Sequence, residues 1–207
     1  MSRQNIVARL KTYQPISTGD LPPVAKANRE QKLDQFVDNI TALKGEVIRC
    51  KSGEAVQRFQ QLLKDKSIHH LCVGQTQELQ DYVRQLPDGI DLTVYSQPIE
   101  SFRKQMFSSI DAGLTSCHGA IAETGTIILY SHVEQPRLLS LVPPIHIAIL
   151  HQRQLFADMA EWLNTVDSSS VPANMILVSG PSKSADIEQV LAYGVHGPRQ
   201  LVILLIE

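Results

Sequence analysis

Two uninterrupted apolar runs stand out in the middle of the chain, at residues 126–130 and 145–150. Both are rich in isoleucine and leucine and neither alternates with polar residues, which is typical of strands covered on both faces. The residues beside and between them include an acid, several hydroxyls, a glycine and an arginine, which contribute little to packing. We therefore predict two buried strands with a binding site next to them.

From residue 46 onward, short apolar runs alternate with amphipathic segments. Apolar residues at i, i+3 and i+4 predict helices, whereas the short runs predict strands. Further strands are expected at residues 46–50, 71–73, 92–95, 113–122, 175–178 and 201–206. Helices are expected after residue 52, after residue 74, and at residues 101–109, 155–166 and 184–191. This alternation predicts an α/β domain with a largely parallel sheet and helices on both faces.

The N-terminal part, residues 1–44, is expected to form a helical arm ahead of the main domain, residues 45–207. Residues 2–12 predict a short helix, and residues 15–24 form a linker rich in Pro, Ser, Thr, Gly and Asp. A clearer helix begins at about Ala25. Its single apolar face is formed by Leu33, Phe36, Val37, Ile40 and Leu43. The pattern leaves open whether the arm packs on the main domain or on a neighbouring subunit.

Composition and charge argue against two classes of protein. The 207 residues include 19 Lys and Arg and 21 Asp and Glu, so the formal net charge is −2 and no basic excess is available for a phosphate backbone. No run approaches the roughly 20 apolar residues of a membrane span, and the N-terminus lacks the apolar core of a signal peptide. We expect a cytoplasmic protein that binds no nucleic acid and has no membrane span.

The three cysteines, Cys50, Cys72 and Cys117, are far apart and form no CxxC motif. This spacing predicts neither a disulfide framework nor a zinc or iron–sulphur site, so no cofactor is expected. Cys117 precedes His118 and invites a Cys–His nucleophile, but a buried free cysteine is the commoner case. A metal site built from Cys117, His118 and Glu123 matches no known ligand spacing.

One candidate site is the sequence Glu123-Thr124-Gly125-Thr126, at the entrance to a predicted strand. Glu123 is a candidate catalytic residue, as a general base or a carboxylate nucleophile, and it could equally anchor the loop by accepting backbone N–H bonds. Thr124, Gly125 and Thr126 are expected to contact a ligand. Arg137 carries a planar guanidinium that suits a carboxylate, although a surface ion pair is the commoner role.

A second candidate site follows the strand at residues 175–178, where Ser179, Gly180 and Ser182 lead into the helix expected at residues 184–191. Ligands of parallel sheets bind at the carboxyl ends of strands, often at helix N-termini, whose N–H groups favour anions. We therefore count these residues as ligand-binding candidates. A serine that only caps the helix is an equal alternative.

Asp186 and Gly197 complete this second set of ligand-binding candidates. The charge of Asp186 in the first helical turn already satisfies the helix dipole, and neither a Walker loop nor a GxGxxG fingerprint is present, so nucleotide binding does not follow. His196, in a glycine-flanked segment, is the second candidate catalytic residue. His146 starts a buried strand, where a histidine is more often a satisfied core residue than a ligand.

Four segments occur in the order AIAETGTIIL, Arg137 with LLSLVPPIHIAIL, SGPSKSADIE and GVHGP. Together they resemble the lactate-utilisation protein C family, also called LutC/YkgG or LUD domain, over residues 45–207. The resemblance implies a fold similar to the NagB/RpiA/CoA-transferase group, in which related enzymes form an acyl intermediate on a glutamate. It also implies that partner proteins A and B, which carry the iron–sulphur motifs, oxidise L-lactate to pyruvate together with this component in bacteria.

The sequence thus predicts a three-layer α/β domain, NagB/RpiA/CoA-transferase-like, with an N-terminal helical arm. Its first functional hypothesis is a non-redox component of an L-lactate utilisation system that binds its partners and a small organic anion. The alternatives are a stand-alone enzyme with acyl-transfer or acid/base chemistry at Glu123, and a small-molecule-binding regulatory module. The sequence leaves the oligomeric state open, and a homo-oligomer is one option.

Overall fold

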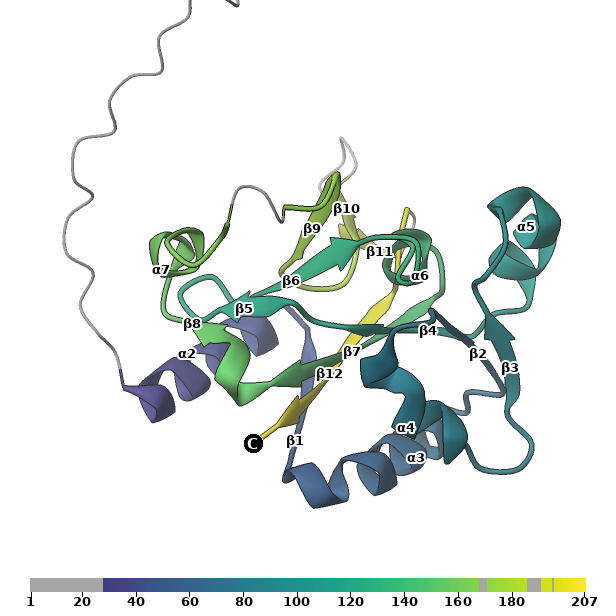
Figure 1. Cartoon of the computed structure of the whole chain (residues 1–207), viewed down its shortest axis with the longest axis horizontal. Helices are drawn as coiled ribbons and strands as arrows, with labels where there is room; N and C mark the ends of the chain where they lie inside the picture. Colours follow the sequence, from purple (N-terminus) through teal and green to yellow (C-terminus); the bar gives the residue numbers. More distant parts are fainter. Residues whose placement is uncertain (1–27, 168–170, 186–190, 195) are drawn as a thin grey trace, which may run out of the picture.

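The computed structural model describes residues 28–167, 171–185, 191–194 and 196–207. Its centre is a six-stranded sheet in the order β1-β12-β7-β4-β2-β3, in which every neighbouring pair is parallel (Figure 1). The strands are β1 (Glu46–Cys50), β12 (Gln200–Ile206), β7 (Ile145–His151), β4 (Ala112–Ser116), β2 (His70–Val73) and β3 (Asp91–Val94). The predicted α/β class with a mostly parallel sheet is confirmed.

Helices α3 (Ala55–Asp65) and α4 (Gln80–Arg84) cover one face of this sheet, the lower face in Figure 1. Each follows a short 3₁₀ turn, η1 (Ser52–Glu54) or η2 (Gln77–Leu79). The apolar residues of α3 recur at helical spacing, so Phe59 and Leu63 point into one cluster with Leu204 of β12. The described residues of this cluster are almost all apolar, so this face forms the larger hydrophobic core.

The opposite face is covered by α2 (Arg29–Ala42) and by a second sheet in the order β8-β5-β6-β9. Its strands are β5 (Gly119–Ile121), β6 (Thr126–Ser131), β8 (Leu155–Phe156) and β9 (Asn174–Val178). Leu33, Phe36 and Ile40 of α2 are buried in one cluster with Ile203 of β12. Each such side chain contributes about 1.5–3 kcal/mol of burial free energy, so the described part of the predicted arm packs on its own domain.

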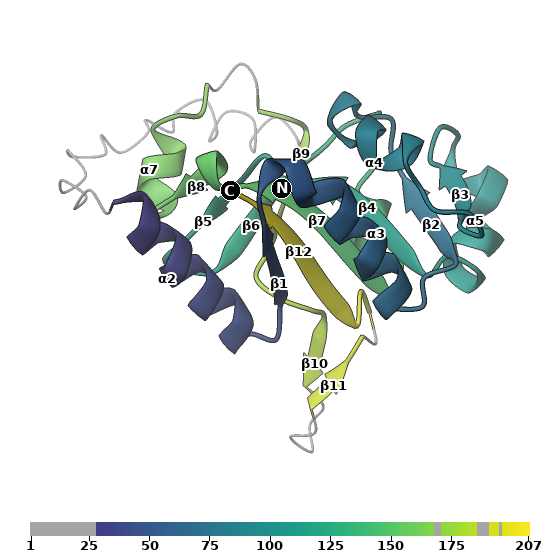
Figure 2. The ribbon, with the colours of Figure 1, turned by 90° about the horizontal axis from the view of Figure 1, so that it is seen from below.

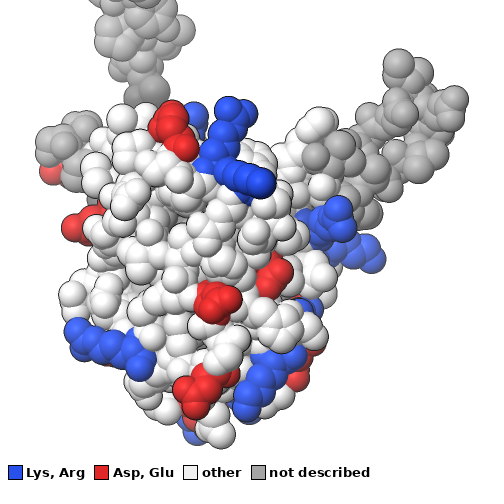
Figure 3. All heavy atoms as spheres, turned by 90° about the vertical axis from the view of Figure 1, so that its right-hand side faces the viewer, with Lys and Arg blue, Asp and Glu red and all other residues white. Residues whose placement is uncertain are grey.

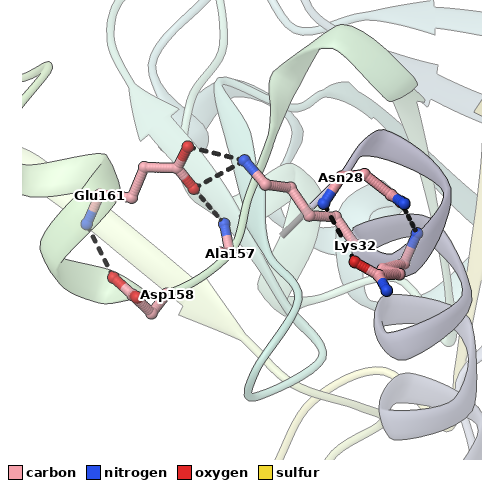
Figure 4. A network of polar contacts seen from close by, with 6 residues as sticks. Asn28, Lys32, Ala157, Asp158 and Glu161 are labelled. Carbon is pink, nitrogen blue, oxygen red and sulfur yellow. Dashed lines mark hydrogen bonds and ion pairs between the residues drawn. The ribbon is translucent and has the colours of Figure 1, made fainter. Parts of the chain in front are cut away.

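An ion pair fastens α2 to the segment after β8 (Figure 4). Lys32 Nζ lies 2.6 Å from Glu161 Oε1 and 2.9 Å from Oε2, and the backbone N–H of Ala157 also donates to this carboxylate. Partial burial raises the pKa of the Glu161 carboxyl, but the hydrogen bonds from Ala157 and Lys32 outweigh this and the pKa lies below its usual value. Asp158 caps α7 (Met159–Leu163) by accepting from the backbone N–H of Glu161 at 2.8 Å.

Helices α5 (Ile99–Ser108) and α6 (Leu138–Leu141) cover the same face near β2 and β3. Their side chains Met106 and Leu139 pack on Cys72 of β2. Basic and acidic side chains are interspersed on the side of the molecule that carries α5 and β3, and no continuous basic band crosses the part drawn there (Figure 3). No helix within the described ranges is long and apolar enough to cross a membrane.

The strand expected at residues 113–122 is two strands, because the chain passes from one sheet to the other. The backbone N–H of Cys117 donates to Ile149 of the large sheet, and the next one, of His118, donates to Ile128 of the small sheet. The strands expected at residues 126–130 and 175–178 exist, but they pair antiparallel as β6 and β9 in the small sheet. An apolar run alone does not specify which sheet the strand joins.

Two predicted helices were wrong in type or extent. Residues 155–166 form β8 followed by the short α7, since the Asp158 cap starts the helix only at Met159. At the two described ends of the helix expected at residues 184–191, β10 (Lys183–Ala185) instead pairs antiparallel with β11 (Leu191–Tyr193), and this pair projects from the domain (Figure 2). Residues 186–190 lie outside the described residues. The helix expected at residues 2–12 lies outside the described residues.

Candidate functional site

A cavity of about 240 Å³ lies where β7 and β12 begin and β9 ends. We call it the amino-edge pocket, because it opens at the amino ends of the parallel strands rather than at the carboxyl ends where ligands were expected. Its described lining residues are Ser140, Leu141, His146, Ile176, Leu177, Val178, Ser179, Gly180, Ser182, His196, Gly197, Pro198 and Leu201.

Five of the residues singled out in the sequence line this pocket: Ser179, Gly180, Ser182, His196 and Gly197. Backbone hydrogen bonds between residues 179–182 and residues 194–198 bring them together. The backbone N–H of Ser182 donates to the carbonyl of Pro198 at 2.9 Å, and that of Gly194 donates to the carbonyl of Ser182 at 2.9 Å. The residues come from the loop after β9 and from the segment between β11 and β12, so they do not lie at the N-terminus of a helix.

Close packing explains two of these glycines. A Cβ atom at Gly180 would lie 2.7 Å from the carbonyl oxygen of Leu43, at the end of α2. A Cβ atom at Gly197 would lie 3.1 Å from Cβ of Ser182. Both positions therefore let the two loops of the pocket approach their neighbours, which is a structural reason for glycine that is independent of a ligand.

His146 forms the buried end of the pocket and is 1% exposed. Its Nε2 lies 2.8 Å from Oγ1 of Thr115, which is also 1% exposed. Its Nδ1 is buried and has no hydrogen-bond partner in the protein. Burial lowers the pKa of His146 to about 3, so the imidazole is neutral near neutral pH. The histidine regarded from the sequence as a satisfied core residue is only half satisfied.

The rest of the described lining combines serine hydroxyls with apolar side chains and carries no charged side chain. Ser140 Oγ donates to the carbonyl of Arg137 at 3.0 Å, and Ser179 Oγ lies 2.8 Å from Oγ1 of Thr126. Leu141 and Leu201 supply apolar surface. No Lys, Arg, Asp or Glu occurs among the described residues that line the pocket. The pocket therefore suits a small ligand with both oxygen atoms and an apolar part.

The turn at residues 123–126 lies outside this lining. The side chain of Glu123 is exposed, whereas its backbone is held by the carbonyl of Ala157 and by Asn39. Asn39 Nδ2 donates to the carbonyls of Ala122 and Glu123, each at 2.9 Å. Gly125 has φ +59°, and a Cβ atom there would lie 2.5 Å from the backbone N of Ile40. Main-chain contacts with α2 thus anchor the turn, not the carboxylate.

Hydroxyl groups connect this turn to the pocket wall. Thr124 Oγ1 lies 2.7 Å from Thr126 Oγ1, which in turn lies 2.8 Å from Oγ of Ser179. Arg137 precedes α6 with an exposed side chain and does not line the pocket, although its carbonyl accepts from Ser140. The roles given to Glu123, Thr124, Gly125, Thr126 and Arg137 stay predictions, and Asp186 lies outside the described residues.

The pair Cys117 and His118 does not have the geometry of an activated nucleophile. Burial raises the pKa of the Cys117 thiol, which works against thiolate formation. The ring of His118 stacks on Tyr130 with centroids 3.6 Å apart and planes 9° apart. Within the part of the chain that the structure describes, no group of three or more His, Cys, Asp or Glu is placed to hold a metal ion.

Sequence reasoning therefore missed His146 as a pocket residue. The available signal was its position in PPIHIAIL, where one polar residue interrupts a strand that is otherwise apolar. The sequence does not show that Thr115, from another strand, is hydrogen-bonded to Nε2 and leaves Nδ1 without a partner.

Comparisons with known proteins agree with the fold and identify the family. The LUD domain family profile matches residues 33–206. An uncharacterized protein of Neisseria meningitidis serogroup B is 33% identical, covering 99% of this chain and 93% of its own length. A lactate utilization protein C of Exiguobacterium is 29% identical, covering 87% of this chain and 80% of its own length.

Among solved structures, a DUF162 family protein from Deinococcus radiodurans has the same fold, with a TM-score of 0.68 and 24% identity over 88% of this chain and 100% of that chain. The resemblance inferred from the four sequence segments is confirmed, and the chain belongs to the LUD domain family, the LutC/YkgG proteins.

Proposed function

We propose that this protein is a non-redox component of a bacterial L-lactate utilisation system and that it binds a small organic acid in the amino-edge pocket. Its family and its relatives named lactate utilization protein C support the role in lactate utilisation. The observation that supports a ligand is the pocket itself, because described residues of three of the four segments line it, those of LLSLVPPIHIAIL, SGPSKSADIE and GVHGP.

The donor set of the chain supports the non-redox assignment. An iron–sulphur cluster requires several cysteine thiolates in one place. Cys50, Cys72 and Cys117 are each buried in the core, and they belong to three different hydrophobic clusters. The resemblance assigns the iron–sulphur motifs to partner proteins A and B. We propose that these two proteins carry out the electron transfer in the cytoplasm and that this chain binds to them.

The chemistry of the pocket supports an acid with a short carbon chain. Serine hydroxyls and two imidazoles offer hydrogen bonds to carboxylate, hydroxyl or oxo oxygens. Leu141 and Leu201 offer contact to a methyl or methylene group, and no described carboxylate in the lining repels an anion. A pocket of about 240 Å³ also limits the ligand to a small molecule.

Two experiments test the proposal. Affinity purification of the chain from its own cells is expected to recover the proteins encoded beside it, and deletion is expected to impair growth on L-lactate but not on glucose. Normal growth on lactate together with no recovered partner would refute the role. In parallel, L-lactate or pyruvate at 100 times its dissociation constant is expected to raise the unfolding free energy by about 2.7 kcal/mol.

A further inference from the structure

Three buried side-chain atoms among the described residues lack a hydrogen-bond partner: Thr76 Oγ1, His146 Nδ1 and Trp162 Nε1. Only His146 also lines one of the described cavities. An unpaired buried polar atom costs about 1–3 kcal/mol, and a pocket occupant can recover this free energy. Among the described residues, His146 is therefore the one that most directly indicates a ligand contact.

The fold holds this imidazole in place from one side. Along β7, Ile147 and Ile149 point to the core beneath α3, whereas His146 and Ala148 point toward the small sheet. Thr115 of the adjacent strand β4 points to the same side, and its Oγ1 is hydrogen-bonded to Nε2 of His146 at 2.8 Å. Because this bond occupies Nε2, Nδ1 is the ring nitrogen without a partner, and a ligand at this buried end reaches the almost fully covered atom only if the lining beside it moves slightly aside.

A neutral imidazole has one N–H and one lone pair, and the threonine hydroxyl can either donate or accept. If Thr115 donates to Nε2, then Nδ1 carries the proton and donates into the pocket. If Nε2 carries the proton and donates to Thr115, then Nδ1 accepts from the pocket. Both arrangements contain the same number of protons and keep the buried Thr115–His146 bond intact.

We propose that His146, held by Thr115, hydrogen-bonds to the oxygen on carbon 2 of the ligand and accommodates both a 2-hydroxy acid and the corresponding 2-oxo acid. The hydroxyl of the 2-hydroxy acid donates to an unprotonated Nδ1, and the carbonyl of the 2-oxo acid accepts from Nδ1–H. The carboxylate lies toward the serine hydroxyls and His196. This inference rests on the proposed function, in which L-lactate and pyruvate are such a pair.

Burial supports the inference because it keeps the ring neutral. A protonated imidazole can only donate, so it could not accept the hydrogen bond from the hydroxyl of the 2-hydroxy acid. The depressed pKa of His146 preserves both tautomers throughout the physiological range. The pocket would therefore hold the substrate and the product of a two-electron oxidation with similar affinity, as a carrier or sensor of that pair would.

Nitrogen NMR of ¹⁵N-histidine-labelled full-length protein tests this directly, because protonated and unprotonated imidazole nitrogens have well-separated chemical shifts. With saturating L-lactate, Nδ1 of His146 is expected to be unprotonated, and with saturating pyruvate it is expected to be protonated. The two dissociation constants, measured by calorimetry, should agree within tenfold. The same tautomer with both acids, or no binding of either, overturns the inference.

Variants provide an independent measurement. His146→Gln places an amide near the Nε2 position and loses the Nδ1 position, so both acids should bind at least tenfold more weakly. His146→Asn places its amide near Nδ1 and can flip between donor and acceptor, so it should bind both acids more tightly than His146→Gln. His132→Gln, at an exposed histidine outside the pocket, is the control.

Equal affinities of His146→Gln and wild type for the two acids would overturn the inference. If either His146 variant fails to fold, the NMR measurement on the wild-type protein still decides. If neither acid binds but the neighbouring proteins are still recovered, this inference and the proposed ligand are refuted, whereas the role in lactate utilisation is not. If both acids bind but with the same His146 tautomer, this inference alone is refuted. Loss of those partners with intact ligand effects refutes the lactate-system role instead.

Discussion

The turn at residues 123–126 and the amino-edge pocket are both built from family motifs, but their polar groups are used in opposite ways. In the turn, Asn39 binds two carbonyls, the threonine hydroxyls bind each other, and Glu123 faces solvent. In the pocket, a fully buried nitrogen of His146 has no partner. A motif that contains an acid can serve the fold, whereas an unsatisfied buried group beside a cavity indicates a ligand.

The two regions are nevertheless in contact, because Thr126 Oγ1 lies 2.8 Å from Ser179 Oγ in the pocket wall. The comparison is therefore open to test. If the turn is structural, changes in it should lower stability and leave ligand binding by the folded protein intact. If the pocket is the ligand site, changes in it should show the reverse.

The largest effect is expected from Gly125→Ala. This residue has φ +59°, and the new Cβ would lie 2.5 Å from the backbone N of Ile40 and 2.8 Å from the backbone C of Asn39. A left-handed backbone costs an alanine about 1–2 kcal/mol, and the clash adds about 1–3 kcal/mol. We expect the free energy of unfolding, from urea titration, to fall by about 3 kcal/mol or more.

Gly89→Ala is the matched control for this change. Gly89 also has a positive φ, +88°, but no atom lies within 4 Å of a Cβ placed there. The unfolding free energy of Gly89→Ala should therefore fall only by the cost of the left-handed backbone, about 1–2 kcal/mol. Equal losses at the two sites would mean that α2 moves aside freely and that the turn is not held by it.

The second-largest effect is expected at acid pH, where the unfolding free energy depends on His146 in the pocket. Burial lowers the pKa of His146 to about 3, whereas the unfolded chain protonates this histidine near pH 6.5. Stability from the neutral ring is therefore complete above pH 6.5 and is lost as the pH falls below it, because only the unfolded state takes up the proton. We expect protonation of this histidine in the unfolded state to lower the unfolding free energy by about 2 kcal/mol between pH 6.5 and pH 5.

The measurement is the pH dependence of the unfolding free energy, compared between wild type and His146→Gln. Burial also lowers the pKa values of His118 and His151, so the variant should keep part of the acid sensitivity. The difference between the two slopes should be about 1.4 kcal/mol per pH unit. Parallel curves would show that the ring is solvated and that the pocket does not enclose it.

The parallel sheet could be predicted because long-range parallel pairing and covering on both faces leave an apolar run in the sequence itself. The small sheet could not, since the run at β6 has the same composition whether its neighbours are parallel or antiparallel. The helix expected at residues 155–166 shows the same limit. Leu155, Phe156 and Met159 fit helical spacing, but Leu155 and Phe156 pair with β5 before Asp158 starts the helix.

The candidate site was predictable only in part, for a related reason. The residues that could be predicted are those where glycine, hydroxyl and imidazole groups gather next to predicted strands: Ser179, Gly180, Ser182, His196 and Gly197. The role of His146 depends on Thr115, which is distant in the sequence and identified only by strand order and register. An unsatisfied nitrogen is a property of the folded environment and leaves no local pattern in the chain.

A third, smaller effect is expected from Asn39→Ala, which removes the donor to the carbonyls of Ala122 and Glu123. One lost hydrogen bond costs about 0.5–1.5 kcal/mol, so the unfolding free energy should fall by about 1–2 kcal/mol. Asn164→Ala, at an exposed residue after α7, should change it by less than about 0.5 kcal/mol. If Asn39→Ala lowers the binding free energy of L-lactate by more than it lowers the unfolding free energy, the turn contributes to the pocket.

The smallest effect is expected from Glu123→Gln, which removes only the charge. The side chain is exposed and lies outside the pocket lining, so the unfolding free energy should change by less than about 0.5 kcal/mol. Dissociation constants for L-lactate and pyruvate, and growth of the complemented deletion strain on lactate, should equal those of wild type. Impaired growth with unchanged stability, ligand binding and recovery of partner proteins would instead indicate that the carboxylate takes part in a reaction, and the turn would then be a catalytic element rather than a structural one.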